Sequence, residues 1–395
     1  MSAPACRGVV VIALALGACV QEEGDHVNEG SRADASPAAV HAWRLTDVPL
    51  LDLATAGAGG AYEFTRIIGA VRLSDGGIVA ANFANPPDIR GFAPDGRHLW
   101  TVGGSGGGPG EFEAIAWIQK LRGDTIVAYD YWQSRLTFLS TAGVLLGVTA
   151  VERADARVGP GGLSLSSMFD DGSLLGRQNL LFPGAPRGEG RLIAPFLRVD
   201  RSGSTWDTIA VLESIDHAEG AEGRPILPLF GRSAVVMVAG NRMVHGMGDQ
   251  FVFAAYDHNG VKEVEFRLGV EPRAVTPELL EQAERAQRSA TAGAGPRANQ
   301  ADLDWRYREG PRAATVPAYD RFRAGGDGRI WVRSYVVPGD PVVRWYSFMP
   351  DGRPEGQLEV PAGLDLLHFA TAEVLGVWTD SLDVQTPRLY GLLPR

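Results

Sequence analysis

Residues 348–353 read Phe-Met-Pro-Asp-Gly-Arg, and residues 92–97 read Phe-Ala-Pro-Asp-Gly-Arg, so one turn motif occurs in two distant parts of the chain. Asp-Gly and Asn-Gly supply the positive φ angles that tight β-hairpins require. Looser copies of this turn, each after an aromatic or β-branched residue, end at Gly143, Gly203 and Gly260. The motif therefore predicts a series of hairpins along the chain.

A second kind of turn precedes a short apolar run. Residues 75–80 read Asp-Gly-Gly-Ile-Val-Ala, and residues 327–332 read Asp-Gly-Arg-Ile-Trp-Val. The two kinds alternate strictly, with glycines at positions 76, 96, 123, 143, 172, 203, 240, 260, 328 and 352. Two successive hairpins make a four-stranded antiparallel unit, and repetition of such units indicates a β-propeller.

The two ends of the chain predict the number of blades. Five complete pairs of turns account for five blades, and the strand-like runs 372–378 and 388–393 supply part of another. We expect residues 43–53 to add its missing outer strand, which would remove the open edge of the ring. The predicted fold is all-β, a six-bladed β-propeller over residues 43–395 whose N-terminal strand closes the last blade.

Two similar Gly-rich stretches, 57–64 and 104–112, support this closure because each should lead from an outermost strand to an innermost one. Residues 104–112 lack the Gly-Lys-Ser/Thr ending of a P-loop. We therefore expect a crossover between blades there, and no phosphate site.

One segment, about 270–315, departs from the period. Residues 276–282 begin a helix, with Thr at the N-cap and Pro in the first turn, that we expect to end near Ala290. A Gly/Ala/Asn-rich loop and the polar-aromatic stretch 302–307 follow. We expect this insertion to cover one face of the ring, and residues 212–229 to form a smaller excursion.

The composition excludes two broad classes. Hydrophobic residues make up 45% of the 395 residues and charged ones 21%, which is enough to bury a core and argues against wholesale disorder. The formal net charge of −10 argues against a nucleic-acid-binding protein. We expect a monomer that uses no cofactor.

The N-terminus has the parts of an export signal. Residues 1–18 carry one charge and then an apolar run, which is too short to span a bilayer. The run ends in Leu-Gly-Ala-Cys at 16–19, which resembles the lipobox of bacterial lipoproteins. That resemblance implies cleavage before Cys19 and lipidation of its sulfur. An ordinary secretory signal with an incidental cysteine is the alternative.

Cysteine usage agrees with a lipoprotein. Cys6 lies in the predicted signal, so Cys19 would be the only cysteine of the mature chain, and no internal disulfide could form. Residues 19–42 read as a flexible tether. We expect lipid anchoring in a bacterial cell envelope, periplasmic or at the surface, with the outer membrane favoured.

The strand 126–130, Ile-Val-Ala-Tyr-Asp, is followed by Arg-Leu-Thr-Phe at 135–138. This sequence pattern, together with the Gly-rich stretch 104–112 and the alternating hairpins, resembles the bacterial extracytoplasmic six-bladed β-propellers related to NHL repeats. The resemblance implies that Asp130 and Arg135 form a structural ion pair or hydrogen-bond pair between adjacent strands. Asp380 and Arg388 resemble a looser copy.

Some six-bladed propellers, such as gluconolactonase-like enzymes, hold a divalent ion in the central tunnel, and NHL-type amidating lyases use His-rich sites there. The seven histidines here show no metal-ligand spacing such as His-x-x-x-His: His26, His41, His98, His217, His245, His258 and His368. Only His245 and His368 are expected near a tunnel. We therefore expect no metal site and name no catalytic residue, and no Gly-x-Ser-x-Gly elbow is present.

Exposed aromatic and Arg side chains favour recognition. We expect Trp117, Trp331 and Trp378 to be core residues. The candidate residues for binding a ligand or partner are Arg66, Trp132, Trp305, Arg306 and Tyr307.

The sequence thus favours a non-enzymatic module that binds a small-molecule ligand or a protein on a propeller face. The alternatives are a metal-dependent hydrolase or lyase with a tunnel site, and a partner of outer-membrane assembly machinery that docks through residues 270–310.

The lipobox makes a direct prediction. Replacing Cys19 by Ser removes the sulfur that would carry the lipid, so the protein should leave the membrane fraction and remain as a longer precursor. Fractionation and intact-mass measurement check both effects. An unchanged distribution between membrane and soluble fractions would show that Cys19 is no anchor.

Overall fold

The structure is a computed structural model that describes residues 40–152, 162–180, 186–220, 223–291 and 300–395. The predicted signal, Cys19 and most of the tether lie outside these residues. None of the helices within the described ranges is both long and apolar enough to cross a bilayer.

Four antiparallel sheets follow one another along the chain, each in sequence order. The sheets of residues 67–267 contain these strands: β3 (Ile67–Arg72), β4 (Ile78–Asn82), β5 (Asp88–Phe92) and β6 (His98–Gly103); β7 (Ile115–Lys120), β8 (Ile126–Asp130), β9 (Arg135–Leu139) and β10 (Leu145–Ala150); β11 (Leu163–Met168), β12 (Leu174–Gln178), β13 (Gly190–Val199), β14 (Trp206–Glu219) and β15 (Pro225–Ile226); β16 (Val235–Ala239), β17 (Arg242–Gly246), β18 (Val252–Tyr256) and β19 (Lys262–Arg267).

The remaining strands join into one larger sheet in the order β20-β21-β22-β23-β1-β26-β25-β24, with β2 also paired to β26. Their bounds are β20 (Tyr319–Ala324), β21 (Ile330–Ser334), β22 (Val342–Phe348), β23 (Pro354–Pro361), β24 (Leu364–Phe369), β25 (Glu373–Thr379), β26 (Gln385–Pro394), β1 (His41–Leu45) and β2 (Leu51–Asp52). The chain therefore contributes both of its ends to this sheet.

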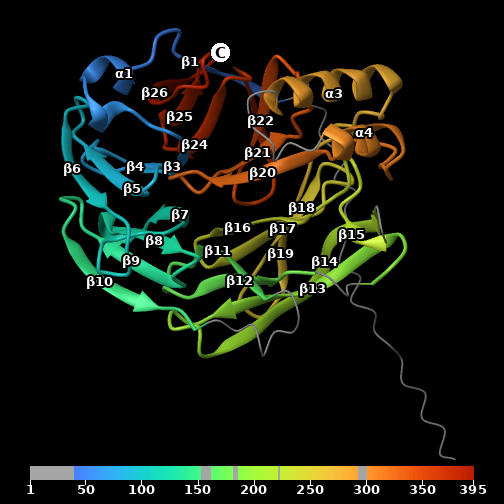
Figure 1. Ribbon diagram of the computed structural model, residues 1–395, viewed down its shortest axis with the longest axis horizontal. Helices are drawn as coiled ribbons and strands as arrows, with labels where there is room; N and C mark the ends of the chain where they lie inside the picture. The colour runs from blue at the N-terminus through green and yellow to red at the C-terminus, as the bar shows by residue number, and fades with distance from the viewer. Residues whose placement is uncertain (1–39, 153–161, 181–185, 221–222, 292–299) are drawn as a thin grey trace, which may run out of the picture. The chain divides into compact units, whose positions relative to one another are not determined.

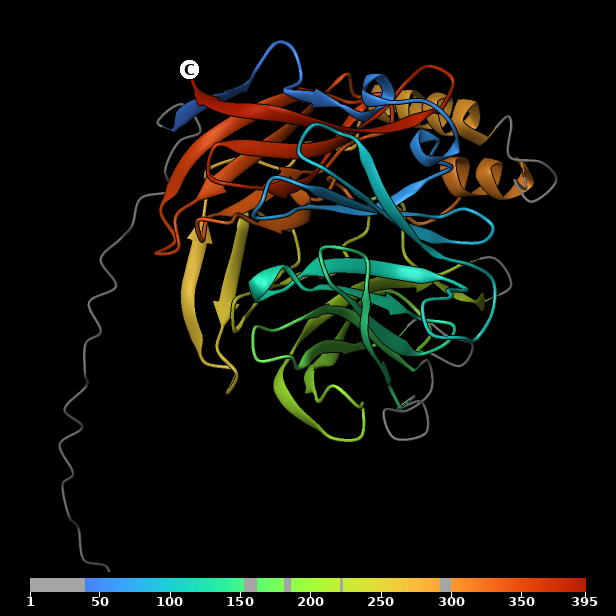
Figure 2. The same ribbon diagram turned by 90° about the vertical axis from the view of Figure 1, so that its left-hand side faces the viewer.

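Neighbouring sheets meet through their first strands. Strand β3 contacts β7, and contacts continue from β7 to β11, β16, β20 and β24 before returning from β24 to β3. Figure 1 shows these strands lining the centre while later strands of each sheet lie further out, and Figure 2 gives the perpendicular view. The fold is mostly β, with curled sheets in a propeller-like arrangement.

The N-terminal segment pairs with the last strand, as the sequence predicts. Trp43, Arg44 and Leu45 of β1 lie antiparallel to residues 392–394 of β26, and β2 pairs with the middle of the same strand. Strand β1 also lies parallel to β23, so it connects the strands β20–β23 with the strands β24–β26. It begins at His41, two residues before the predicted boundary.

All ten predicted turn glycines adopt positive φ, from +65° at Gly240 to +92° at Gly352. Because L-residues with a Cβ seldom adopt this conformation, each glycine fixes where its hairpin reverses. The alternation of turns therefore placed the hairpins correctly. The sequence missed β24, and the predicted excursion 212–229 is partly the outer half of the long strand β14.

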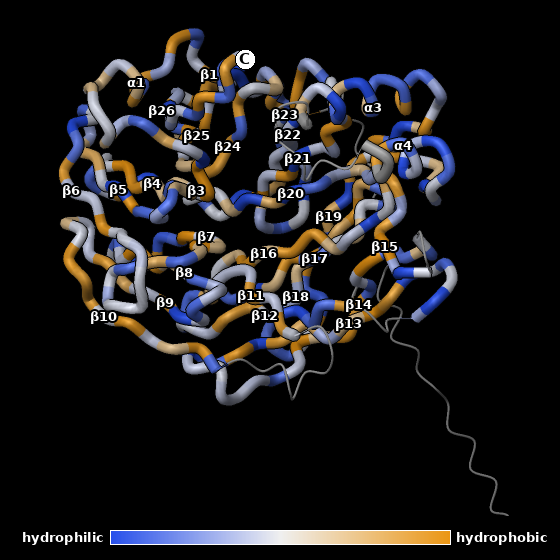
Figure 3. The backbone as a smooth tube through the Cα atoms, viewed as in Figure 1, coloured by the Kyte–Doolittle hydropathy of each residue, from blue (hydrophilic) through white to orange (hydrophobic). Residues whose placement is uncertain are grey.

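The insertion contains two helices, α3 (Pro277–Thr291) and α4 (Gln300–Arg308). Helix α3 begins where predicted, and the Thr276 hydroxyl accepts a hydrogen bond from Leu279 N at 3.3 Å. Helix α4 was not predicted. Figure 3 shows hydrophobic colouring along β16 and β10, whereas α3 is largely hydrophilic, as befits a helix outside the sheets. The short helix α1 (Leu53–Ala56) and two 3-10 turns, η2 (Gly60–Tyr62) and η3 (Arg122–Asp124), complete the elements.

If β26 closes the structure, replacing a buried leucine of this strand should destabilise the protein far more than replacing an exposed leucine nearby. Leu389 is 2% exposed in β26, where it packs among Leu53, Phe92 and Leu375, whereas Leu382 is 81% exposed in the turn before this strand. Leu389→Ala should lower the free energy of unfolding by about 3 kcal/mol, because it leaves a cavity in the closing sheet. Leu382→Ala is the matched control and should cost under about 0.5 kcal/mol. Urea unfolding measures both, and equal stabilities would contradict the importance of this strand.

Candidate functional site

Asp130, at the end of β8, is a structural carboxylate. Its side chain is fully buried. One oxygen accepts hydrogen bonds from Glu113 N at 2.7 Å and Ala114 N at 3.1 Å, and the other accepts from Trp132 N and Gln133 N, both at 3.0 Å. Asp130 therefore ties the entry of β7 to the turn after β8.

Arg135, opposite Asp130 on β9, holds the Gly-rich crossover. Its guanidinium donates to the carbonyl oxygens of Gly107 and Gly108 at 2.8 Å each, and to that of Glu111. The expected pairing of Asp130 with Arg135 is wrong, because both side chains bind backbone groups and the described residues contain no ion pair between them. Their structural role remains, through the backbone.

The sheet β3–β6 uses the same device. Asn82 accepts hydrogen bonds from the backbone of Thr65 and Arg66 at 3.0 and 3.3 Å. Arg90 donates to three carbonyl oxygens within residues 60–63, at 2.6 to 3.2 Å. Both Gly-rich crossovers are thus held by an arginine on the third strand of the sheet that follows them, Arg90 on β5 and Arg135 on β9. This shared contact explains why the two stretches are similar in sequence.

The side chain of Glu111 lies within the crossover 104–112. The Glu111 carboxylate accepts a hydrogen bond from Gly108 N at 2.6 Å. A Cβ at Gly106, where φ is +143°, would lie 2.2 Å from an oxygen of that carboxylate. The loop therefore closes upon Glu111.

The looser copy in the last group of strands is also corrected. Arg388 pairs with Asp52 of β2 at 2.8 Å and lies over the Trp378 ring. Asp380 instead accepts hydrogen bonds from Leu382 N and Val384 N within its own turn. Arg388 therefore ties the N-terminal segment to β26.

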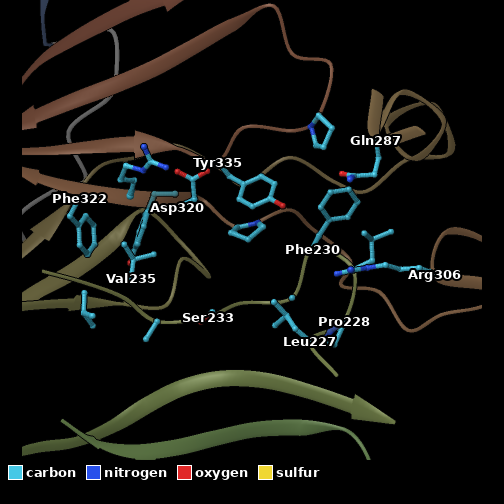
Figure 4. A pocket seen from close by; sticks show the side chains of 18 of the residues that line it. Leu227, Pro228, Phe230, Ser233, Val235, Gln287, Arg306, Asp320, Phe322 and Tyr335 are labelled. Atoms are coloured by element: carbon cyan, nitrogen blue, oxygen red, sulfur yellow. The ribbon is translucent and has the colours of Figure 1, made fainter. Parts of the chain in front are cut away.

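A cavity of about 600 Å³ lies between the sheets and the insertion, and we call it the mouth cavity. Figure 4 shows Gln287, Arg306, Phe230 and Tyr335 around it, with Ser233, Val235 and Asp320 on the strand side. Its walls come from separate parts of the chain: residues 227–231 and 233–236, Gln287 of α3, Leu303, Arg306 and Tyr307 of α4, residues 317 and 319–323, and Arg177, Tyr335 and Pro338.

Two of the five candidate binding residues line this cavity. Arg306 is exposed, and Tyr307 is 7% exposed with its ring packed in the cluster that contains Leu229 and Phe230. Burial raises the pKa of the Tyr307 phenol. Trp305, on the same helix, is half-buried and does not line the cavity.

The other two candidates belong to other sheets and line no part of the mouth cavity. Arg66 is exposed beside β3, with its guanidinium over the Phe83 ring at 4.5 Å. Trp132 is 60% exposed in the turn between β8 and β9, edge to face with Tyr131. The five candidates are therefore not one site.

The mouth cavity is strongly cationic. Four arginines line it, Arg177, Arg306, Arg321 and Arg323, against one carboxylate, Asp320. Arg321 lies 2.6 Å from Asp365.

Asp320 has its own partner, Arg333, at 2.7 Å. No ion pair of the described residues involves Arg177, Arg306 or Arg323. Arg177 donates to Ala234 O at 3.3 Å, and Arg323 to Phe322 O at 3.1 Å. These three guanidinium groups therefore line the cavity without an ion-pair partner among the described residues, although the charges of Asp365 and Asp320 also act on Arg323.

A second cavity of about 410 Å³, the tunnel cavity, is lined by the first strands β3, β7, β11, β16, β20 and β24. Val236, Phe322 and Arg323 line both cavities, so the two adjoin. Within the described part of the chain, no group of three His, Cys, Asp or Glu side chains is placed to hold a metal ion.

Of the two histidines expected near a tunnel, one lines the tunnel cavity and the other is packed in the core. His368 of β24 lines the tunnel cavity, where burial, with the charges of Lys120 and Arg72, lowers its pKa to about 4. His245 lies edge to face with Phe196 and Tyr256, its Nε2 2.8 Å from Glu213 O. Burial lowers its pKa too. His245 is therefore a core histidine.

Of the three predicted core tryptophans, only Trp331 is fully buried. Trp331 is 1% exposed and stacks on Phe369 at 4.4 Å, while Trp117 and Trp378 are partly buried against core clusters. The sequence missed Arg177 and Arg323. The signal for Arg323 was present, since Asp-Arg-Phe-Arg at 320–323 puts charges on an innermost strand, where side chains face either the tunnel or a neighbouring sheet.

No protein-family model matches the chain, and no curated protein matches it either. Among solved structures, a member of the DUF4221 family from Bacteroides vulgatus matches with a TM-score of 0.53 and 10% identity, over 90% of this chain and 99% of that one. A gluconolactonase from Xanthomonas campestris matches with a TM-score of 0.41 and 12% identity, over 92% and 99%. Identities this low concern the fold alone, which is propeller-like.

His368 predicts a pH effect on stability. Its folded-state pKa of about 4 lies below the ordinary value of 6.5, so the unfolded chain binds more protons between these values. Stability from neutral His368 is present above pH 6.5 and is lost as the pH falls towards 4, by up to about 1.4 kcal/mol per pH unit. Unfolding of wild type and His368→Gln between pH 7 and 4 should show the shallower slope in the variant. Parallel curves would contradict this pKa.

Proposed function

We propose that this protein is a six-bladed β-propeller, lipid-anchored in a bacterial cell envelope, that binds a small-molecule ligand in the mouth cavity without transforming it. The cyclic contacts of the first strands β3, β7, β11, β16, β20 and β24 support the blade count. The signal-like residues 1–18 and Cys19 support the proposed location in the cell envelope. The observation that carries the function is the mouth cavity itself.

The cavity has the composition of a ligand site. Its volume of about 600 Å³ suits a small organic molecule. The aromatic rings of Phe230 and Tyr335 lie edge to face with their centroids 6.1 Å apart, and they give the cavity an apolar surface. Pockets with apolar walls and a few directed polar groups bind ligands with defined orientation.

The local backbone also fits a binding role. Phe230 holds a φ of +59°, which is unfavourable for a residue with a Cβ and needs support from surrounding packing. That packing comes from the buried cluster that Phe230 forms with Tyr307, Val316 and Val337. Backbone strain of this kind is concentrated at functional sites.

The polar groups of the cavity support a binding role. The walls present guanidinium, hydroxyl and amide groups and the Asp320 carboxylate, all of which suit recognition. The metal-dependent hydrolase or lyase would need a ligand set for its ion. Metal analysis of the purified full chain distinguishes the two, because one stoichiometric ion lost on changing tunnel residues would favour the enzyme.

Blocking the cavity tests the proposal. Ser233 lines it, and Ser233→Trp would fill part of the space, whereas Ser381→Trp changes an exposed turn residue far along the chain. A library of small soluble fragments is screened against the full chain by ligand-observed NMR. Fragments that bind wild type and Ser381→Trp should bind Ser233→Trp at least tenfold more weakly, because the indole occupies their site. Equal binding to both variants would refute the mouth cavity as the site.

A further inference from the structure

The charges of the mouth cavity oppose those of the whole protein. The chain carries a formal net charge of −10, yet four arginines and one carboxylate line the cavity. The neighbouring Arg333 and Asp365 add one charge of each sign and leave this excess unchanged. A site with the opposite sign from its protein needs a reason, and a bound group of negative charge supplies one.

The three unpaired guanidinium groups reach different depths. Arg306 is exposed on α4 and lines the cavity. Arg177 is half-buried and donates to Ala234 O, and Arg323 lies where the mouth and tunnel cavities adjoin. An entering ligand would therefore meet a cation at the opening and others inside.

The inner cations are held at an energetic cost. Burial lowers the pKa of Arg177 and lowers that of Arg323 to about 10, with the charge of Arg321 as a further cause for Arg323. A guanidinium has five donors, and the backbone carbonyls near these two residues take few of them. Oxyanions bind guanidinium groups through charge-assisted, often paired hydrogen bonds.

Resting on the proposed ligand-binding function, we infer that the mouth cavity binds an amphipathic oxyanion, a carboxylate or phosphate carried on an apolar or planar body. The anionic group lies between Arg177 and Arg323, and Arg306 guides its entry. The apolar body packs against Phe230 and Tyr335.

The test measures binding of defined anions to the full chain in detergent by isothermal titration calorimetry. Citrate and pyrophosphate distinguish the carboxylate from the phosphate source, benzoate adds an aromatic body to one carboxylate, and benzyl alcohol is its neutral counterpart. At least one anion should bind, at least tenfold more tightly than benzyl alcohol, and its affinity should fall between 20 and 500 mM NaCl.

Single replacements locate the anion. Arg323→Gln and Arg306→Gln should each weaken binding of that anion at least tenfold, with Arg323→Gln the larger loss. Arg353→Gln is the matched control, because Arg353 is 70% exposed in a distant turn and should leave affinity unchanged. Because Arg306 is exposed, the Arg306→Gln variant should fold. It can therefore test the inference even if Arg323→Gln fails to fold.

Three results would overturn the inference: no anion binds, benzyl alcohol binds as tightly as benzoate, or both arginine variants bind as wild type does. If anions fail while neutral fragments still lose binding in Ser233→Trp, the proposed function stands and only the anion preference falls. If anion binding survives Ser233→Trp but is lost in Arg353→Gln, the anion lies elsewhere and both proposals fall.

Discussion

The structure depends on the hydrogen bonding of β26 along both of its edges. On one side it pairs with β25 over seven registered positions, from Glu373–Gly391 to Thr379–Gln385. On the other it receives β1 and β2, and Arg388 adds an ion pair to Asp52. Gln385 also accepts a hydrogen bond from Ile67 N at 2.7 Å, which ties the last strand to the first sheet. Because an unpaired strand edge exposes backbone donors and acceptors, this double pairing stabilises the arrangement in which the first strands surround a tunnel.

Arginine has two roles in this protein, and the partners of each guanidinium separate them. Arg90 and Arg135 donate hydrogen bonds to carbonyl oxygens of the Gly-rich crossovers, so they stabilise the fold. Arg177 of β12 and Arg323 of β20 belong to the same scaffold, but each donates a single side-chain hydrogen bond, to a backbone carbonyl oxygen. Since chain geometry decides which carbonyls come within reach, the same residue type is structural at a crossover and available to a ligand beside a cavity.

The sequence predicted what short-range chemistry determines. Each turn glycine is required by the φ angle of its own hairpin, so the hairpins could be placed from neighbouring residues alone, as could the first helix from its N-cap. The closing segment was predicted differently, by counting strands and by comparing the two Gly-rich stretches. Helix α4 could not, because its apolar residues Leu303, Trp305 and Tyr307 alternate with charged ones instead of recurring every three or four positions. The mouth cavity could not be predicted either, since Ser233, Arg306 and Arg323 come from three segments whose meeting is decided by packing. For Asp130 and Arg135 the residues were right and the partners wrong, because sequence shows side chains but not which backbone groups approach them.

The opposed signs of protein and cavity have a consequence for how an anion would bind. At physiological ionic strength, charges are screened over about 8 Å, so distant surface carboxylates contribute little inside the cavity and the nearby guanidinium groups dominate there. Outside it, the net charge of −10 gives an approaching anion no long-range attraction. Association would therefore gain no long-range electrostatic steering and only local attraction from Arg306, and the affinity would depend on slow release from Arg177 and Arg323. A receptor of this kind gains selectivity at the site of contact, where a neutral molecule of the same shape leaves both cations without partners.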